Sequence, residues 1–466
     1  MALHIDSHLT ARQLRRRIES AFELSAHKIL ALEKSWDGAA GSRTRRGTPV
    51  LTVRGRYTTR GWTEWTQGFQ FGSALLQYDA TGERRFLELG RERTVTRMAP
   101  HLSHVGVHDH GFNNISTYGN LLRLMREEKI PFDPWEQDFY ALALKMSGAV
   151  QACRWARIDG GGGYIYSFNG PQSLFVDTIR SLRSLAVAYR LGHRLWAEQD
   201  EEVPLLERLI EHGLATATYN VFYGTGRDVY DVRGRTAHES LFNPVNGRYR
   251  CPSTQQGYSP FSTWTRGLAW ALCGFSEQLE FLATLTDRDL PRAGRHRAMA
   301  AFEKAACATA DFYMENSCRD GIPMWDTGAP NLHRLGDYLR RPADPFNRWE
   351  PVDSSAAAIA AQGLVRLGNY LRANRREKAG AHYRQAGLTV ARTLFSEPYL
   401  TTDPKHHGLL SHSVYHRPNG WDYVARGEKV PNGESSLWGD YHLRELGLLL
   451  LREARAEPYL TFFGIS

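Results

Sequence analysis

The chain has 466 residues, of which 42% are hydrophobic and 11% aromatic, enough apolar material for a large core. Its net charge is +8, but the basic residues are dispersed. No zinc-finger spacing or RNA-binding aromatic signature accompanies them, which argues against a nucleic-acid-binding protein. Five cysteines, odd in number and without CxxC spacing, argue against a disulfide framework and a structural zinc site.

Targeting signals and domain boundaries are not evident in the sequence. The first residues lack the apolar core of a secretory signal, and no stretch approaches the roughly 18 apolar residues of a membrane span. No proline-, glycine- or serine-rich linker divides the chain, and the glycine cluster at 160–163 is short enough to be a loop. We therefore expect a cytoplasmic protein, without a membrane partner, whose residues 1–466 form a single domain.

The first predicted helix begins near residue 10. Thr10 and Gln13 have the spacing of a capping box, and Leu14 and Ile18 follow at helical intervals. Residues 36 to 60 have a looser pattern rich in Gly, Thr and Arg, which predicts a long loop that includes a hairpin.

Helical segments of two kinds then alternate along the chain. One kind is rich in small and apolar residues, as at 356–361, and a helix that is apolar nearly all round is buried. The other kind carries more charge and should face solvent. The inner segments are approximately 65–78, 111–126, 174–191, 262–284, 353–371 and 440–454. The outer segments are approximately 10–35, 84–102, 134–156, 200–218, 292–316 and 376–396.

This alternation favours an all-α fold, an (α/α)6 barrel of six inner and six outer helices. The inner segments begin roughly 45 to 90 residues apart, which is too uneven for a solenoid with a fixed repeat. Long loops on one end of a barrel would account for the uneven spacing. An irregular all-α bundle or a solenoid of helical hairpins is the alternative.

Each inner segment has a polar, aromatic or acidic cluster at or near its N-terminal end. The clusters are residues 65–69, 108–112, 176–178, 262–267, 352–355 and 438–441. A ring of such helices would gather all the clusters at one end of the protein. Carboxylates, a histidine and aromatic rings in one place are what a sugar-cleaving pocket needs.

Asp109 and Asp177 are the candidate catalytic residues. Asp109 lies between two histidines at the start of a helix and could simply cap it. Asp177 leads into an apolar stripe, where a charge is costly unless it is capped, paired or functional. Two carboxylates brought together would repel one another, so that one would have a raised pKa and could serve as a general acid near neutral pH.

Candidate binding residues follow in the next third of the chain. His238 lies in a polar loop and could be merely solvated. Trp264 and Trp270 could stack on a sugar ring or belong to the core. Arg266 stands in so apolar a segment that it indicates an anionic partner, either a carboxylate of the protein or one of the substrate.

An ordered series of short motifs carries a family resemblance. The sequence resembles the unsaturated glucuronyl hydrolases, glycoside hydrolase family 88, and their relatives the unsaturated rhamnogalacturonyl hydrolases. Each motif is weak alone, but their order and approximate spacing match from about residue 10 to residue 452. The motifs are Trp65-Thr66-x-Gly68-Phe69, His108-Asp109-x-Gly111-Phe112, Asp177, His238, Gln256-Gly257-Tyr258, Trp264-x-Arg266-Gly267-x-Ala269-Trp270, Asp353-Ser354-Ser355-Ala356 and Trp438-Gly439-Asp440-Tyr441.

The resemblance implies an (α/α)6 barrel that acts on oligosaccharides left by polysaccharide lyases. Such an enzyme hydrates the C4=C5 vinyl ether of a terminal 4,5-unsaturated uronic acid, and the resulting hemiketal opens and expels the remaining sugar. One carboxyl can donate the proton to C4 and then take one from water. The resemblance implies no cofactor and no metal. It gives the acid–base role to Asp177 and a tuning role to Asp109. The implied substrate-binding residues are Trp65, His238, Gln256, Arg266 and Trp270.

The chain also departs from the family pattern. Arg180 and Ser181 stand where the family has an apolar stretch with an Asn, 70–72 reads Gln-Phe-Gly in place of Trp-Pro-Gly, and Leu268 stands where a Gln is common. Arg180 could lower the pKa of the catalytic acid, or bind a sulfate or a second carboxylate. Whether it and Arg183 reshape the pocket is left open.

Three functions remain in competition at this stage. The first is hydration of an unsaturated uronide. The second is another uronide hydrolase on the same barrel, acting on saturated glucuronides or on unsaturated rhamnogalacturonan. The third is a non-catalytic sugar binder, against which the presence of two Asp residues and His238 argues.

Overall fold

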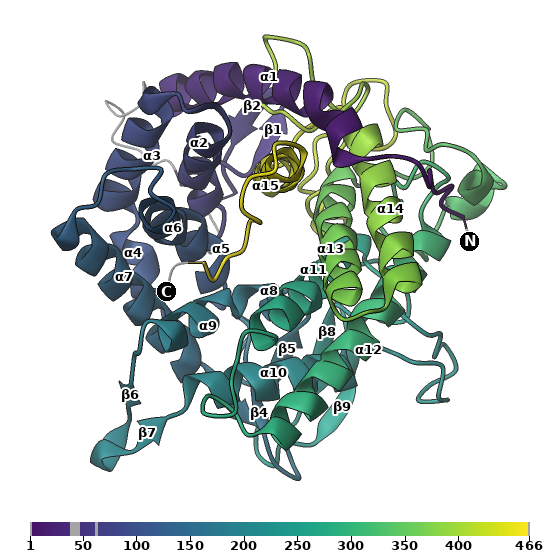
Figure 1. The fold of residues 1–466 in the computed structure, drawn as a ribbon. Helices are drawn as coiled ribbons and strands as arrows, with labels where there is room; N and C mark the ends of the chain where they lie inside the picture. The colour runs from purple at the N-terminus through teal and green to yellow at the C-terminus, as the bar shows by residue number, and fades with distance from the viewer. Residues whose placement is uncertain (1, 38–46, 61–63, 465–466) are drawn as a thin grey trace.

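The computed structural model describes residues 2–37, 47–60 and 64–464. Its helices form two concentric rings around one axis (Figure 1). The inner helices are α2 (Gln67–Thr81), α5 (His110–Asn114) continued by α6 (Asn120–Arg126), α8 (Thr178–Ser181) with α9 (Arg183–Arg190), α11 (Thr265–Leu282), α13 (Ser354–Ala373) and α15 (Leu437–Ala454). The outer helices are α1 (Ala11–Asp37), α3 (Arg84–Arg97) with α4 (Ala99–Leu102), α7 (Pro134–Cys153), α10 (Leu205–Tyr219), α12 (Arg292–Asn316) and α14 (Glu377–Leu394). The predicted all-α (α/α)6 barrel is confirmed.

The inner helices are the buried ones, as their composition predicts. Every residue of α11 except Glu280, and every residue of α13 except Asn369, Arg372 and Ala373, is buried. The outer helix α1 is buried along one side only, and its capping box forms as predicted. The backbone N–H of Thr10 donates to Gln13 Oε1 at 2.8 Å, and the backbone N–H of Gln13 donates to Thr10 Oγ1 at 3.3 Å.

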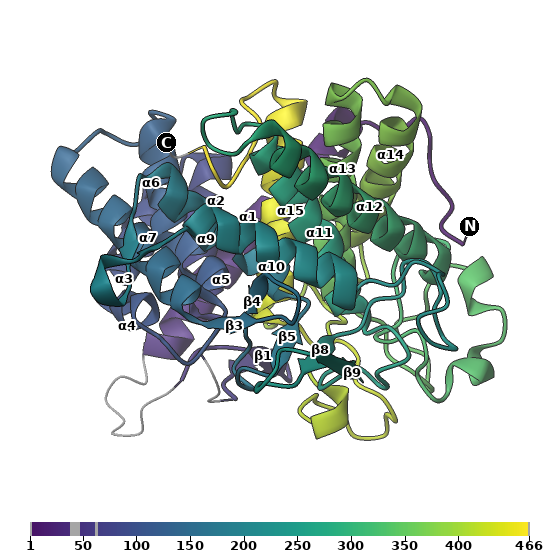
Figure 2. The ribbon, with the colours of Figure 1, turned by 90° about the horizontal axis from the view of Figure 1, so that it is seen from below.

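Most of the short strands lie at one end of the barrel, opposite the end of the chain that follows α15 (Figure 2), whereas β6 and β7 project from the outer edge of the ring (Figure 1). They form small antiparallel sheets, β1–β2, β3–β4, β5–β8–β9 and β6–β7. The predicted hairpin within 36 to 60 is confirmed by β1 and β2, whereas residues 38–46 lie outside the described residues. The strands are β1 (Leu51–Val53), β2 (Arg56–Thr58), β3 (Trp155–Arg157), β4 (Gly163–Ile165), β5 (Ser173–Phe175), β6 (Leu195–Trp196), β7 (Glu202–Val203), β8 (Glu239–Phe242) and β9 (Tyr249–Ser253).

Three predicted boundaries are wrong. Residues 174–175 belong to strand β5, because their backbone pairs with β8, some 65 residues later in the chain, and the helix starts only at Thr178. The helix predicted to start at residue 200 starts at Leu205. Pro204 is its N-cap residue and has an extended backbone, and a proline disfavours helical geometry in the residue before it, which here belongs to strand β7. The segment 84–102 is broken at Met98, which separates α3 from α4.

Two glycines bring the N-terminal ends of neighbouring inner helices together. A Cβ at Gly68 would lie 2.3 Å from the carbonyl oxygen of Asn113, and one at Gly111 would lie 2.1 Å from that of Ser181. No side chain fits at these separations, so glycine allows α2, α5 and α8 to touch backbone to backbone. Ser181 also accepts the N–H of Gly111 at 2.9 Å and donates to the carbonyl of His108 at 2.6 Å. The unusual Ser181 therefore fixes the segment that carries Asp109.

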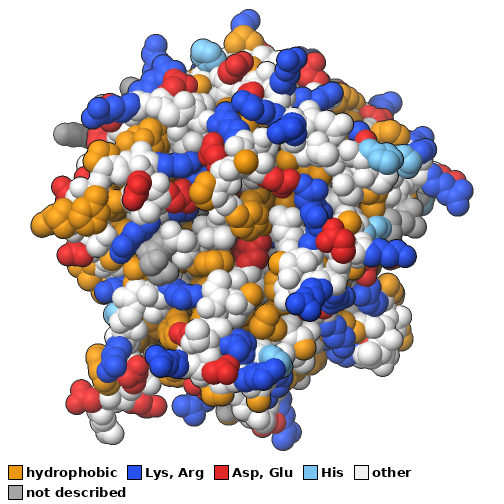
Figure 3. Space-filling model, viewed as in Figure 1, with side chains coloured by type: hydrophobic (Ala, Val, Ile, Leu, Met, Phe, Trp, Pro, Cys, Tyr) orange, Lys and Arg blue, Asp and Glu red, His pale blue; other side chains and the backbone are white. Residues whose placement is uncertain are grey.

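Charged side chains on the face seen in Figure 1 are interspersed, with acidic groups among the basic ones and no large patch of one sign (Figure 3). This matches the dispersed basic residues of the sequence. Among the described residues, no helix is long and apolar enough to cross a membrane.

Candidate active site

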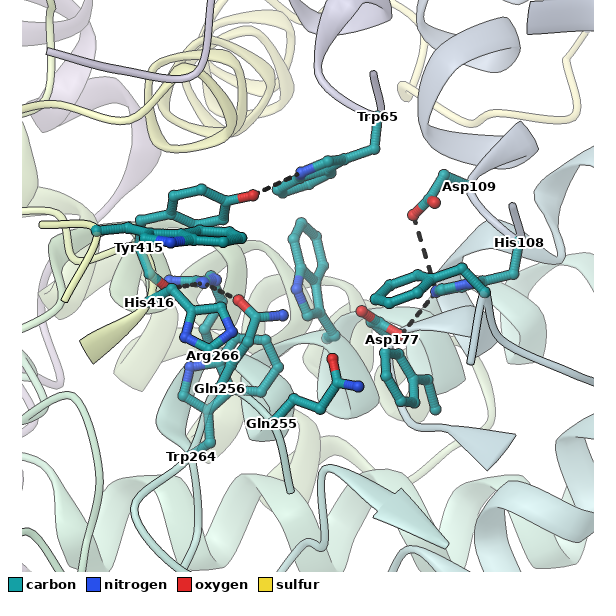
Figure 4. A pocket seen from close by; sticks show the side chains of 14 residues that line it. Trp65, His108, Asp109, Asp177, Gln255, Gln256, Trp264, Arg266, Tyr415 and His416 are labelled. Carbon is teal, nitrogen blue, oxygen red and sulfur yellow. Dashed lines mark hydrogen bonds and ion pairs between the residues drawn. The ribbon is translucent and has the colours of Figure 1, made fainter. Parts of the chain in front are cut away.

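A pocket opens at the end of the barrel where the inner helices begin (Figure 4). All the predicted site residues except His238 line it. The lining residues are Trp65, His108, Asp109, Phe168, Phe175, Asp177, Gln255, Gln256, Trp264, Arg266, Trp270, Tyr415, His416 and Trp421.

Neither candidate carboxylate caps a helix with its side chain. Asp109 is the N-cap residue of α5 and Asp177 that of α8, yet neither side chain makes a capping hydrogen bond. In contrast, the carboxylate of Asp353, at the start of α13, accepts the N–H groups of Ser355 and Ala356. The capping interpretation of Asp109 and Asp177 is therefore wrong, and both carboxylates are available to the pocket.

His108 lies between the two carboxylates. Its Nε2 atom is 3.4 Å from Asp177 Oδ1 and 3.8 Å from Asp109 Oδ1, as the dashed lines in Figure 4 show. The imidazole is 1% exposed, and the rings of Phe168 and Phe175 pack against it at centroid distances of 5.8 and 5.4 Å. The three groups form a buried carboxylate–imidazole–carboxylate cluster.

The two carboxyls differ in their affinity for a proton. Burial raises the pKa of Asp109 to about 6 against the opposing charge of His108, and the nearby Asp177 adds to the rise. Burial also acts to raise the pKa of Asp177, but the contact with His108 and its charge outweigh burial and hold this pKa below its ordinary value. The expectation that one of the pair has a raised pKa is thus confirmed, and that residue is Asp109.

The raised pKa of Asp109 predicts a pH-dependent gain of stability when the carboxyl is removed. Below pH 4 the carboxyl of Asp109 is protonated in both the folded and the unfolded protein, so its replacement by Asn leaves the free energy of unfolding unchanged. Above pH 6 the carboxyl is ionised, and because its pKa is raised from 3.8 to about 6 by folding, the ionised form destabilises the fold. Asp109→Asn should therefore exceed the parent in free energy of unfolding by about 3 kcal/mol at pH 8, and match it near pH 4. Urea unfolding at both pH values measures this. An equal difference at pH 4 and pH 8 would contradict the assignment.

Arg266 is anchored by a carboxylate of the protein itself. Its guanidinium lies 3.1 Å from Asp353 Oδ2 and donates to the carbonyls of Val414 and Tyr415. It also donates to Gln256 Oε1 at 2.7 Å. Of the two anionic partners considered for Arg266, the structure shows the internal one. Arg266 thereby ties the start of α11 to Gln256 and to the 414–415 loop, which form one wall of the pocket.

His238 lies behind the pocket wall. It is buried between the rings of Phe175 and Trp264, at centroid distances of 4.5 and 4.7 Å, and its Nδ1 accepts the backbone N–H of Gln255 at 3.0 Å. Burial lowers the pKa of its imidazole to about 4. The interpretation of His238 as a solvated loop histidine is therefore wrong. The structure shows a neutral ring that supports the loop carrying Gln255 and Gln256, and direct contact of His238 with a sugar stays a prediction.

Arg180 does not reach the pocket. It is fully buried beneath it, where its guanidinium donates twice to Glu277 at 3.1 Å and once to Glu445 at 2.6 Å. Arg183 joins the same cluster, 3.5 Å from Glu445. Because these charges are neutralised inside the barrel, Arg180 has no free face for a sulfate or a substrate carboxylate. Its guanidinium lies 5.8 Å from the ring of Trp270 and so supports the pocket floor.

Several lining residues are not among the site residues predicted from the sequence. His108 belongs to one of the sequence motifs, but the motif assigns it no role. Its position next to Asp109 is the feature of the sequence that could identify it as a site residue. Tyr415, His416 and Trp421 come from a loop with no helical periodicity, and Tyr415 accepts a hydrogen bond from Trp65 Nε1 at 3.5 Å. Such a long-range contact leaves no trace in the local pattern.

The ring of Trp65 stacks on Trp438 at a centroid distance of 5.0 Å, and Trp270 packs against Phe112 at 4.9 Å. Trp65 and Trp270 both line the pocket. The packing of Trp438 and Phe112 against them restricts the movement of the two rings.

Among the described residues, no group of three or more His, Cys, Asp or Glu side chains could hold a metal ion.

The fold is an (α/α)6 barrel, and its pocket combines two carboxylates with aromatic rings. Proteins of known function are similar to this chain. The chain is 26% identical to the unsaturated glucuronyl hydrolase of Bacillus sp. (strain GL1) over 407 residues, 85% of this chain and 89% of that protein. It is 24% identical to the unsaturated glucuronyl hydrolase of Formosa agariphila, over 82% of this chain and 78% of that one. The resemblance to the unsaturated glucuronyl hydrolases is confirmed by these relatives.

The solved structures agree on the fold. The crystal structure of the Bacillus sp. GL1 unsaturated glucuronyl hydrolase superposes with a TM-score of 0.69 at 22% identity, over 94% of this chain and 97% of that one. No protein-family model matches the chain.

Proposed function

We propose that this protein is an unsaturated glucuronyl hydrolase, which releases a 4,5-unsaturated uronic acid from the non-reducing end of lyase-generated oligosaccharides. The relatives named above carry that activity in their names. The observation that carries the proposal is the Asp109–His108–Asp177 cluster, in which two buried carboxyls of different proton affinity face one aromatic pocket.

The cluster suits hydration of a vinyl ether. A carboxyl delivers a proton to C4, positive charge develops at C5 and the ring oxygen, and a neighbouring carboxylate stabilises it. Water then adds at C5 and loses its proton to a carboxylate, so that the acid is regenerated. The resulting hemiketal opens and expels the remaining sugar. We assign the proton transfer to Asp177 and the tuning of that residue to Asp109, following the resemblance.

The aromatic rings and polar side chains would bind the sugar. Trp65 and Trp270 present ring surface to the pocket, and such faces stack on the apolar side of a pyranose. Gln256 and Arg266 offer polar atoms on the opposite wall. We propose that these four residues hold the uronic acid, with His238 acting through the Gln255–Gln256 loop.

The test is consumption of the C4=C5 bond, followed by its ultraviolet absorbance. Unsaturated disaccharides made by lyases from chondroitin, heparin, gellan and pectin would be mixed with the purified protein. We expect the absorbance to decay with at least one of them. A flat trace across all four would refute the proposal and direct attention to saturated uronides.

We also propose that residues 1–466 act as a single catalytic domain, because helices from α1 to α15 contribute to one continuous hydrophobic cluster. A reducing compartment such as the cytoplasm is our proposed location. Its support is that all five cysteines are free.

A further inference from the structure

His108 makes contacts that its neighbour His110 does not. Both imidazoles are 1% exposed, but His110 faces Ser147 and the carbonyl of His104, whereas His108 turns a single nitrogen towards both catalytic carboxylates. Neither imidazole nitrogen of His108 makes a hydrogen bond among the described residues, so Nε2 meets the two carboxylates through ion-pair contacts. The polar interactions of His108 are thus concentrated on Asp109 and Asp177.

The charges around His108 favour its protonated form. Burial alone would lower the pKa of its imidazole, but Asp109 and Asp177 outweigh burial, and the pKa is raised despite the opposing charge of Arg154. Burial lowers the pKa values of the neighbouring His238 and His212 to about 4 and about 3, so both are neutral near pH 7. Of these three histidines, His108 is therefore the one whose positive charge acts on the two carboxylates.

We propose that His108 is a positioning residue whose imidazolium sets the different proton affinities of the two catalytic carboxyls. Its Nε2 atom faces Asp177 Oδ1 at 3.4 Å and Asp109 Oδ1 at 3.8 Å, so one positive charge acts on both carboxyls. The closer carboxyl, Asp177, receives the larger share of this stabilisation. The proposal rests on the function proposed above.

The kinetic test is His108→Gln, which keeps a hydrogen-bonding amide but removes the charge. Since His108 lowers the pKa of both carboxyls, its loss should move the whole pH profile of kcat/KM to higher pH by about one unit or more. We expect kcat to fall about 100-fold with little change in KM. A reduced kcat with the parent's pH profile would show a merely structural role and overturn the proposal.

The matched control is His110→Gln, the same substitution two residues along, at equal burial and without a carboxylate contact. Its pH profile should coincide with that of the parent, even if the variant is less stable. A similar shift in both variants would mean that any change in this segment disturbs the site.

A second measurement does not depend on turnover. Nuclear magnetic resonance of histidine-labelled parent protein, with the His108 signal assigned by its loss in His108→Gln, should show this imidazole protonated at neutral pH. In Asp177→Asn its pKa should fall. A neutral His108 at pH 7 would overturn the proposal, whatever the substrate. Conversely, a protonated His108 in a protein that consumes no unsaturated sugar would leave the cluster intact and refute the proposed function alone.

Discussion

Asp177→Asn is expected to lower kcat for consumption of the C4=C5 bond by about 10³-fold or more. Asparagine fills the same space in the pocket, so binding of the sugar and KM should change little. The amide can neither donate a proton to C4 nor take one from water. His108 would also lose its 3.4 Å contact, and with it part of the charge that holds it protonated. The decay of the ultraviolet absorbance of the C4=C5 bond at saturating substrate measures this change in kcat.

Asp440→Asn provides the comparison for this variant. Asp440 is also buried in the first turn of an inner helix, where it accepts the Tyr57 hydroxyl at 2.7 Å and the backbone N–H groups of Leu409 and Leu410. It does not line the pocket. Its loss should reduce stability and leave kcat of the folded protein close to that of the parent. If Asp177→Asn retained the parent's kcat, the assignment of Asp177 would be refuted.

Arg266→Met is expected to destabilise the fold by about 3 kcal/mol, because removing one member of a buried ion pair leaves the other charge uncompensated. Arg266 is 1% and Asp353 0% exposed, so bulk solvent does not reach the pair. The carbonyls of Val414 and Tyr415 lose their donor as well. Gln256 would then lose its anchor, so KM should rise in parallel. Urea unfolding and steady-state kinetics give the two quantities.

Two further variants make this result specific. Arg248→Met removes the same kind of side chain from an exposed ion pair with Asp159, at 2.9 Å, and should change stability by less than about 0.5 kcal/mol. Adding Asp353→Asn to Arg266→Met should restore part of the loss, since the unpaired carboxylate is then removed. If the double variant were as unstable as the sum of the single ones, the buried charge would not be the cause.

The sequence alone determines much of the barrel, because the spacing of small and apolar residues along the chain predicts which segments form helices and which of those helices are buried. The period of small and apolar residues predicts α11, α13 and α15 to within a few residues. The clusters at the start of the inner helices predict where the site lies, since helix N-termini in such a ring share one end. Asp109, Asp177, Trp65 and Trp270 are found in the pocket for this reason.

Only the tertiary structure decides what depends on contacts between distant segments. Strand β5 forms where a helix was predicted, because β8 supplies hydrogen bonds that outweigh local propensity. Arg180 is withdrawn from the pocket by Glu277 and Glu445. The protonation of Asp109 depends on its desolvation, and that of Asp177 on an imidazole 69 residues earlier in the chain. The distances and charges around these side chains depend on residues far apart in the chain, so no local pattern of the sequence encodes them.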